Sequence, residues 1–122
     1  LTERLTCAKE LMEAGCLLRL CFDPMIYVPG WRAHYEAMLE QVFGVLDLDK
    51  IVDVSVGSFR VSQDYLKNMR RQQKDSAVVW FPFQCDNGYC HYPRELLEQM
   101  ETFLTTRLVA KISGEKIFRW SI

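Results

Sequence analysis

Short apolar segments of strand length alternate along this chain with longer amphipathic segments, and this alternation limits the folds open to it. Apolar residues spaced three and four positions apart predict helices over residues 2–14, 31–46 and 63–73, and another after Pro93. Apolar, β-branched runs predict strands over residues 16–22, 51–56, 77–83 and 116–122. A helix between consecutive strands is a crossover that joins parallel strands. We therefore expect a single α/β domain over residues 1–122, with repeating strand–helix units and a mostly parallel sheet.

Glycine, proline and serine mark the ends of these segments. Gly15 ends the first helix, because glycine enters the left-handed C-terminal conformation without strain. Pro24 should end the first strand, because it has no N–H for the ladder. Ser62 is the expected N-cap of the third helix, and Pro93 the expected first-turn residue of the fourth. Residues 84–91 are expected to form a loop.

Polar side chains interrupt the first two predicted strands at every second position. Arg19, Cys21 and Asp23 do so in the first strand, and Asp53 and Ser55 in the second. Side chains alternate along a strand, so the polar residues share one face while the apolar ones pack under helices. A buried charge needs a partner, so we expect Arg19 and Asp53 to pair in a polar cavity, such as the lumen of an open barrel. The alternative is an edge strand whose polar face meets water.

The ends of the predicted strands carry candidate ligand-binding residues. Ligands of parallel α/β proteins lie at the carboxyl ends of strands. After the second strand, Gly57 permits close approach of the backbone, and Ser58 and Arg60 are suited to holding a phosphate or carboxylate. An ordinary strand-to-helix turn is the alternative explanation.

Composition and charge exclude several classes of protein. Hydrophobic residues make up 49% and charged residues 25%, which is typical of a globular chain. The net charge is -1, so nucleic acid would need a local patch, for which the candidates are Lys67, Arg70, Arg71 and Lys74. A solvated helix face also explains that run. No apolar run approaches the ~20 residues that span a bilayer, and no signal peptide opens the chain, so we expect no membrane partner.

The five cysteines indicate a reducing, cytoplasmic setting rather than a secreted disulfide framework. Cys16 and Cys21 are expected to be small buried hydrophobes in a strand. Cys85, Cys90 and His91 could supply three zinc ligands from one loop, but the spacing is wide and a fourth ligand is missing, so we assign no metal site. No glycine-rich phosphate loop, nucleophile elbow or His-Glu-x-x-His pair is present, and we name no catalytic residue.

Several short motifs, taken in order, resemble the C-terminal half of spore photoproduct lyase and its radical-SAM relatives. They are Leu18-Arg19-Leu20 with Asp23-Pro24-Met25-Ile26, then Pro29-Gly30-Trp31, Val56-Gly57-Ser58-Phe59-Arg60, and Tyr92-Pro93. The resemblance covers nearly the whole chain after Gly15 and implies part of an open (β/α)6 TIM-like barrel with a polar lumen. Because the chain starts at Leu1, inside a predicted helix, we expect it to be a C-terminal fragment of such a barrel.

The resemblance implies an enzyme that cleaves S-adenosylmethionine to a radical, which reverses a thymine dimer in DNA. The Cys-x3-Cys-x2-Cys that binds the family's 4Fe-4S cluster is absent, and none of the five cysteines has that spacing. The cluster and the hydrogen-donating cysteine are therefore expected in an upstream part, which is this fragment's expected partner. The fragment alone should bind no cluster and be inactive.

The resemblance also assigns residues to the pocket. Tyr92 matches a substrate-positioning tyrosine, and His91 stands where the family tends to have arginine, which bears on substrate specificity. The expected substrate rim is Ser58, Arg60, His91 and Tyr92, and the expected cofactor-binding residues are Arg19 and Asp53. Two alternatives remain open: a radical-SAM enzyme with a substrate other than DNA, and a stand-alone, non-catalytic α/β binding module.

Overall fold

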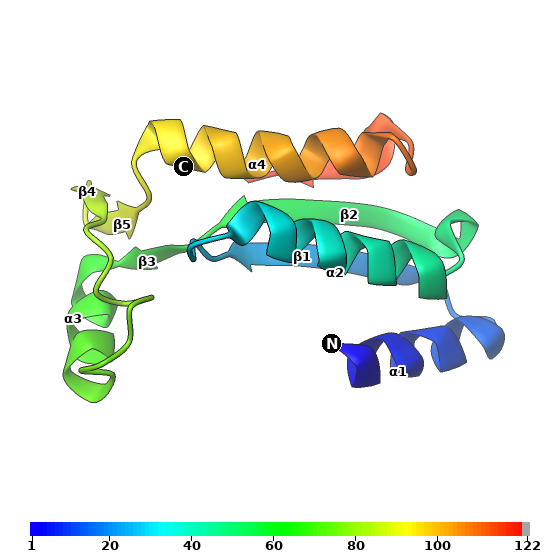
Figure 1. The fold of residues 1–122 in the computed structure, drawn as a ribbon, viewed down its shortest axis with the longest axis horizontal. Helices are drawn as coiled ribbons and strands as arrows, with labels where there is room; N and C mark the ends of the chain where they lie inside the picture. The colour runs from blue at the N-terminus through cyan, green and yellow to red at the C-terminus, as the bar shows by residue number, and fades with distance from the viewer. Residues whose placement is uncertain (121–122) are drawn as a thin grey trace.

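A three-stranded parallel sheet in the order β1–β2–β6 lies at the centre of the structure, a computed structural model that describes residues 1–120 (Figure 1). The strands are β1 (Leu18–Met25), β2 (Ile51–Ser58) and β6 (Ile117–Arg119). The helices beside them are α1 (Thr2–Glu13), α2 (Trp31–Val45) and α4 (Arg94–Val109), and the short 3-10 helices η1 (Leu48–Lys50) and η2 (Gly114–Lys116) precede β2 and β6. The parallel pairing confirms the expected α/β class.

Helices α1, α2 and α4 build one hydrophobic core on one face of this sheet. The buried stripe of α4 includes Met100 and Leu104, which share the core with Val54 and Val56 of β2. Leu20 of β1 is partly buried against the same core. In the described part of the chain no helix covers the opposite face, where Arg19, Cys21 and Phe118 are exposed. The predicted division of the strands into a polar and an apolar face is therefore confirmed.

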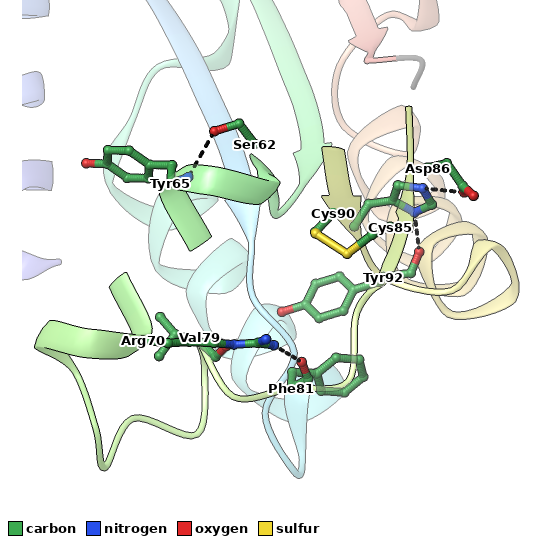
Figure 2. Close-up of a disulfide and its surroundings, with 10 residues drawn as sticks. Ser62, Tyr65, Arg70, Val79, Phe81, Cys85, Asp86, Cys90 and Tyr92 are labelled. Carbon is green, nitrogen blue, oxygen red and sulfur yellow. Dashed lines mark hydrogen bonds and ion pairs between the residues drawn. A yellow bond between two sulfur atoms is a disulfide. The ribbon is translucent and has the colours of Figure 1, made fainter. Parts of the chain in front are cut away.

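A second, antiparallel sheet in the order β3–β5–β4 lies beyond the carboxyl ends of β1 and β2, at the left of Figure 1. Its strands are β3 (Arg60–Ser62), β4 (Gln84–Asp86) and β5 (Tyr89–His91), and α3 (Gln63–Gln72) packs beside them. Leu66, Val79 and Cys90 form a small separate core here. The Ser62 side chain accepts a hydrogen bond from Tyr65 N–H at 3.3 Å, which confirms the predicted N-cap of α3 (Figure 2).

The strand predicted over residues 77–83 is wrong, since this described segment forms turns. Its carbonyls bond to one side chain instead of a neighbouring strand: Arg70 donates to Val79 O at 2.7 Å and to Phe81 O at 3.1 Å (Figure 2). Among the apolar side chains that suggested a strand, Val79 packs with Leu66 and Cys90, and the Phe81 and Phe83 rings are 5.3 Å apart. Arg70 is thus partly buried and structural, so the predicted basic run is not one uniform solvated face.

The loop predicted over residues 84–91 is in fact the β4–β5 hairpin. Its turn is Asn87–Gly88, where φ is 53° and 82°. Positive φ at both turn residues suits the twist of a two-residue hairpin, and Asn-Gly is its strongest sequence signal. A disulfide joins Cys85 to Cys90 across the two strands (Figure 2).

The first and last strands also differ from the prediction. β1 begins at Leu18 and continues through Pro24 to Met25, with a cis Asp23–Pro24 bond. The proline interrupts the ladder without ending it, since the register shifts between Phe22 and Met25 and pairing then resumes. Cys16 and Cys21 are exposed, so their expected burial is wrong: Cys16 precedes the strand, and Cys21 lies on its open face. The last strand ends at Arg119, and residues 121–122 of the prediction lie outside the described residues.

Candidate functional site

A bidentate ion pair between Asp23 and Arg60 lies at the carboxyl ends of β1 and β2. Arg60 Nη1 and Nη2 each donate to one Asp23 carboxylate oxygen at 2.9 Å. The bond to Asp23 raises the pKa of Arg60 above its already high value, against the opposing effect of burial, so the guanidinium stays charged. Gly57 lies beneath the pair, and a Cβ there would be 2.9 Å from both side chains. The Trp120 ring centroid is 5.2 Å from the Arg60 guanidinium carbon.

A buried carboxylate, Glu101 of α4, connects this edge to the next strand. Glu101 is 2% exposed, and its Oε2 accepts from Ser58 N–H at 3.1 Å and from Ser58 Oγ at 2.9 Å. Its other oxygen accepts from Arg119 of β6 at 3.4 Å, and Arg119 also donates to Glu98 at 3.3 Å. A buried carboxylate is tolerated where it is paired and hydrogen-bonded, as here. The network fixes the end of β2 against α4 and β6.

The open face of the sheet carries the predicted pair of Arg19 and Asp53. The two residues are neighbours in the β1–β2 register, with 3.4 Å between Arg19 Nε and Asp53 Oδ2. This confirms the pairing, but the Arg19 side chain is 75% exposed, so the pair faces open space. An open cavity of about 500 Å³ lies on this face. Its lining includes Arg19, Cys21, Asp53, Ser55, Phe118 and Trp120.

A second cavity of about 430 Å³ lies between the N-terminal half of α4 and the end of β6. Its wall includes His91, Arg94 and Glu98, and it shares Arg119 and Trp120 with the open-face cavity. The two cavities therefore meet at the carboxyl edge, which offers both signs of charge and an indole ring to a ligand.

His91 and Tyr92 are buried where the hairpin meets α4. His91 Nδ1 is 2.7 Å from Tyr92 O, and its Nε2 is 3.2 Å from Asp86 Oδ2 (Figure 2). The Tyr92 hydroxyl accepts from Tyr27 N–H at 2.8 Å, its ring is 0% exposed, and burial raises its pKa. Phe81 packs edge-on against the ring at 4.9 Å.

The structure brings only part of the predicted rim together. Arg60 lies opposite His91 in the β3–β5 register and donates to Ser58 O at 3.1 Å. The Ser58 hydroxyl faces Glu101, and the Tyr92 ring is enclosed, so neither side chain is exposed to a ligand in this arrangement.

Four residues of the site were missed by the sequence analysis: Asp23 as the partner of Arg60, Glu101, Arg119 and Trp120. Glu101 had a usable signal, because it lies within the apolar stripe formed by Leu97, Met100 and Leu104. A charge within a buried stripe indicates a paired or functional group. Arg119 and Trp120 had no comparable signal.

The donor groups of the described residues do not fit a metal cluster. No group of three or more His, Cys, Asp or Glu side chains is positioned to hold a metal ion in that part of the chain. Cys85 and Cys90 are bonded to each other, which uses two of the three zinc ligands considered from sequence. The other cysteines, Cys7, Cys16 and Cys21, are exposed.

Comparison with protein-family models, curated proteins and solved structures finds no match for this chain. Within residues 1–120, none of the helices has both the length and the apolar character needed to cross a membrane.

Proposed function

We propose that the chain is the C-terminal barrel segment of a radical-SAM enzyme of the spore photoproduct lyase type, and that it contributes part of the substrate and cofactor pocket. The observation that carries the proposal is that, among the described residues, helices cover one face of the parallel sheet and leave the other face open. Helices α1, α2 and α4 share a core with one face, while the other face presents Arg19, Asp53 and Cys21. Parallel sheets normally have both faces covered, and in a barrel the second face is turned inward. A polar open face therefore suits the lumen of an open (β/α)6 barrel.

In this proposal S-adenosylmethionine binds against the open face. The molecule has an ammonium group, a carboxylate and a flat adenine ring. Asp53 suits the ammonium and Arg19 the carboxylate, while Phe118 offers an aromatic surface to the ring. Replacing the Arg19–Asp53 contact by contacts with the ligand costs little free energy, because an exposed ion pair contributes about 0–1 kcal/mol to stability.

The substrate approaches the carboxyl edge, where His91 lines the second cavity and Arg60 lies opposite His91 in the β3–β5 register. Ser58 and Tyr92 act from behind this rim: Ser58 holds the end of β2 through Glu101, and the Tyr92 carbonyl contacts the His91 ring. DNA is the substrate implied by the resemblance. A radical-SAM enzyme with another substrate is the alternative, and it is favoured by the histidine at position 91, where the family tends to have arginine.

The 4Fe-4S cluster of such an enzyme is assigned to another part of the protein, since the cysteines of this chain do not fit one. When bound, such a cluster would supply the electron for cleavage of S-adenosylmethionine. In this proposal, the residues described above bind and orient the ligands.

An NMR titration with S-adenosylhomocysteine, an inert analogue, tests the cofactor assignment. The signals of Arg19, Asp53 and Phe118 should shift, and Asp53→Asn should weaken binding at least about tenfold through loss of a charge-assisted contact. Asp49→Asn is the control, because Asp49 is an exposed carboxylate on η1. Absence of shifts at millimolar ligand, or shifts confined to another surface, would refute the assignment.

Fluorescence anisotropy with a thymine-dimer oligonucleotide tests the substrate. Binding through Arg60 and neighbouring cations should weaken steeply with salt and fall in Arg60→Ala. Binding whose affinity depends neither on the salt concentration nor on the thymine dimer would favour a substrate other than DNA.

A stand-alone binding module is the second candidate function. One observation favours it: every buried side-chain nitrogen and oxygen among the described residues has a hydrogen-bond partner. This candidate predicts that the chain is monomeric and unfolds in one cooperative transition, with no ligand shifts on the open face.

A further inference from the structure

The disulfide of the β4–β5 hairpin forms from strictly local geometry. Cys85 and Cys90 are opposite each other in the register, five positions apart, around the Asn87–Gly88 turn (Figure 2). The turn itself brings the two sulfur atoms together, so the bond can form and break without unfolding the main core. That core lies under α1, α2 and α4 and does not include either cysteine.

A purely structural role explains this disulfide poorly. Cross-links stabilise mainly by restricting the unfolded chain, and the effect is smallest for short rings such as this one. The bond ties β4 to the adjacent strand and to no distant element. β5 is already paired with β3 on its other side. Where the surroundings are reducing, disulfides are usually transient and serve exchange or sensing.

The two cysteines differ in exposure. Cys85 is exposed, while Cys90 is 0% exposed and packs with Leu66 and Val79. An incoming thiolate therefore attacks the sulfur of Cys85, and the sulfur of Cys90 leaves. The exchange has one direction of entry, which is a testable asymmetry.

The hairpin is coupled to the second cavity through His91. Among residues 1–120 the edge strand β4 pairs only with β5, and its Asp86 contacts His91 Nε2 at 3.2 Å. The other ring nitrogen is 2.7 Å from Tyr92 O, so polar contacts at both nitrogens hold the imidazole ring in its orientation. His91 forms part of the cavity wall. Without the disulfide, β4 would be held by its ladder with β5, and Asp86 would be free to move away from His91.

We propose that Cys85 and Cys90 form a reversible dithiol–disulfide site that exchanges with a dithiol reductant and so controls the orientation of His91 in the cavity wall. One thiolate of the reductant attacks Cys85, the Cys85–Cys90 bond breaks, and Cys90 leaves as a thiolate that takes up a proton. The second thiolate of the reductant then attacks the reductant's first sulfur, which is bonded to Cys85 in the mixed disulfide. This step releases Cys85, which is also protonated. Two electrons and two protons pass to the hairpin, and the reductant leaves as its disulfide.

Trapping experiments test the direction of attack. The variant with Cys7, Cys16 and Cys21 replaced by Ser retains only this pair, so every thiol titrated belongs to it. We expect dithiothreitol to release two thiols, oxidised glutathione to restore the bond, and glutathione to be trapped on Cys85. A pair that does not reoxidise, or glutathione found on Cys90, would overturn the proposal.

The two histidines of the chain allow a matched test of the coupling. Reduction should shift the ring signals of His91 and leave those of His34, an exposed residue of α2, in place. Amide hydrogen exchange of residues 84–86 should become at least about tenfold faster, while β1 and β2 keep their protection. Cys85→Ser should give the His91 signals of the reduced protein. Unmoved His91 signals, or equal loss of protection across the sheet, would contradict a local switch.

Discussion

Gly57 determines how closely charged groups can approach the carboxyl edge of the sheet. The Asp23–Arg60 pair crosses its backbone, which leaves no room for a Cβ. From the sequence we expected a group to approach the backbone closely at Gly57, but we took that group to be a ligand. A glycine indicates that some group comes close; it does not say whether that group belongs to a ligand or to the protein.

We predict that Gly57→Ala destabilises the protein by about 1–3 kcal/mol, because the ion pair must move to admit the methyl group. Gly44→Ala is the matched control. Gly44 lies inside α2, and an added methyl group there would meet no atom within 4 Å, so the same change should stabilise the protein by about 0.5–1 kcal/mol. Urea unfolding measures both free energies. A neutral Gly57→Ala would show that the pair adjusts freely.

The two carboxylates that contact Arg119 should differ widely in their contribution to stability. Glu101→Ala leaves the buried Ser58 N–H and hydroxyl without an acceptor, so we expect a loss of about 2–4 kcal/mol. Glu98→Ala removes an exposed partner of the same arginine and should cost less than about 1 kcal/mol. Denaturant midpoints of both variants give the comparison, and equal losses would mean that Arg119, not Ser58, dominates.

At the level of elements, the sequence predicted the structure well where burial of a periodic stripe decides it. The helices beside the parallel sheet and the apolar faces of β1 and β2 follow directly from spacing. The prediction failed over residues 77–83, where Arg70 binds the carbonyls and takes the place of a neighbouring strand. A contact between one side chain and distant carbonyl groups leaves no periodic pattern in the sequence. The β4–β5 hairpin was predictable, since Asn87–Gly88 is the usual signal for it.

The N-caps of α3 and η2 provide a test at this scale. Ser62 accepts a hydrogen bond from Tyr65 N–H, so Ser62→Ala should cost about 1 kcal/mol. Ser113 holds the same position before η2 but makes no side-chain cap bond. Ser113→Ala should therefore change the free energy of unfolding by less than about 0.5 kcal/mol. Thermal or urea unfolding gives both values, and similar losses would argue against a role for the Ser62 hydroxyl.

Across the whole molecule, the candidate site was predictable only where it lies within neighbouring strands. Arg19 and Asp53 follow from alternation along β1 and β2 once the strands are taken as adjacent. Arg119 and Trp120 belong to the site only because β6 returns to pair with β2. A sequence of separate apolar segments does not specify that strand order, so these residues could not be assigned beforehand.

Two tyrosine hydroxyls connect the loop after β1 to the rest of the molecule. Tyr35 of α2 accepts from Ile26 N–H at 2.7 Å, and Tyr92 accepts from Tyr27 N–H at 2.8 Å. Burial raises the pKa of each hydroxyl above the usual 10.0, partly opposed by these backbone hydrogen bonds. Both groups are therefore protonated more readily in the folded than in the unfolded chain.

We predict that this difference makes the protein progressively less stable at alkaline pH. The folded state holds the two protons more tightly, so their contribution is complete below the unfolded pKa of 10.0 and is lost as the pH rises through the folded values. Above that pH, each hydroxyl lowers the free energy of unfolding by at most about 1.4 kcal/mol per pH unit.

Tyr35→Phe and Tyr92→Phe should be less stable by about 1 kcal/mol near neutral pH, because each loses a hydrogen bond, but their stability should fall less steeply between about pH 10 and pH 11. Tyr65→Phe and Tyr89→Phe are the controls, since both rings are exposed and should leave the wild-type slope unchanged. Urea unfolding of the five proteins across this range measures the slopes, and a common slope for all of them would show that burial of Tyr35 and Tyr92 does not govern alkaline stability.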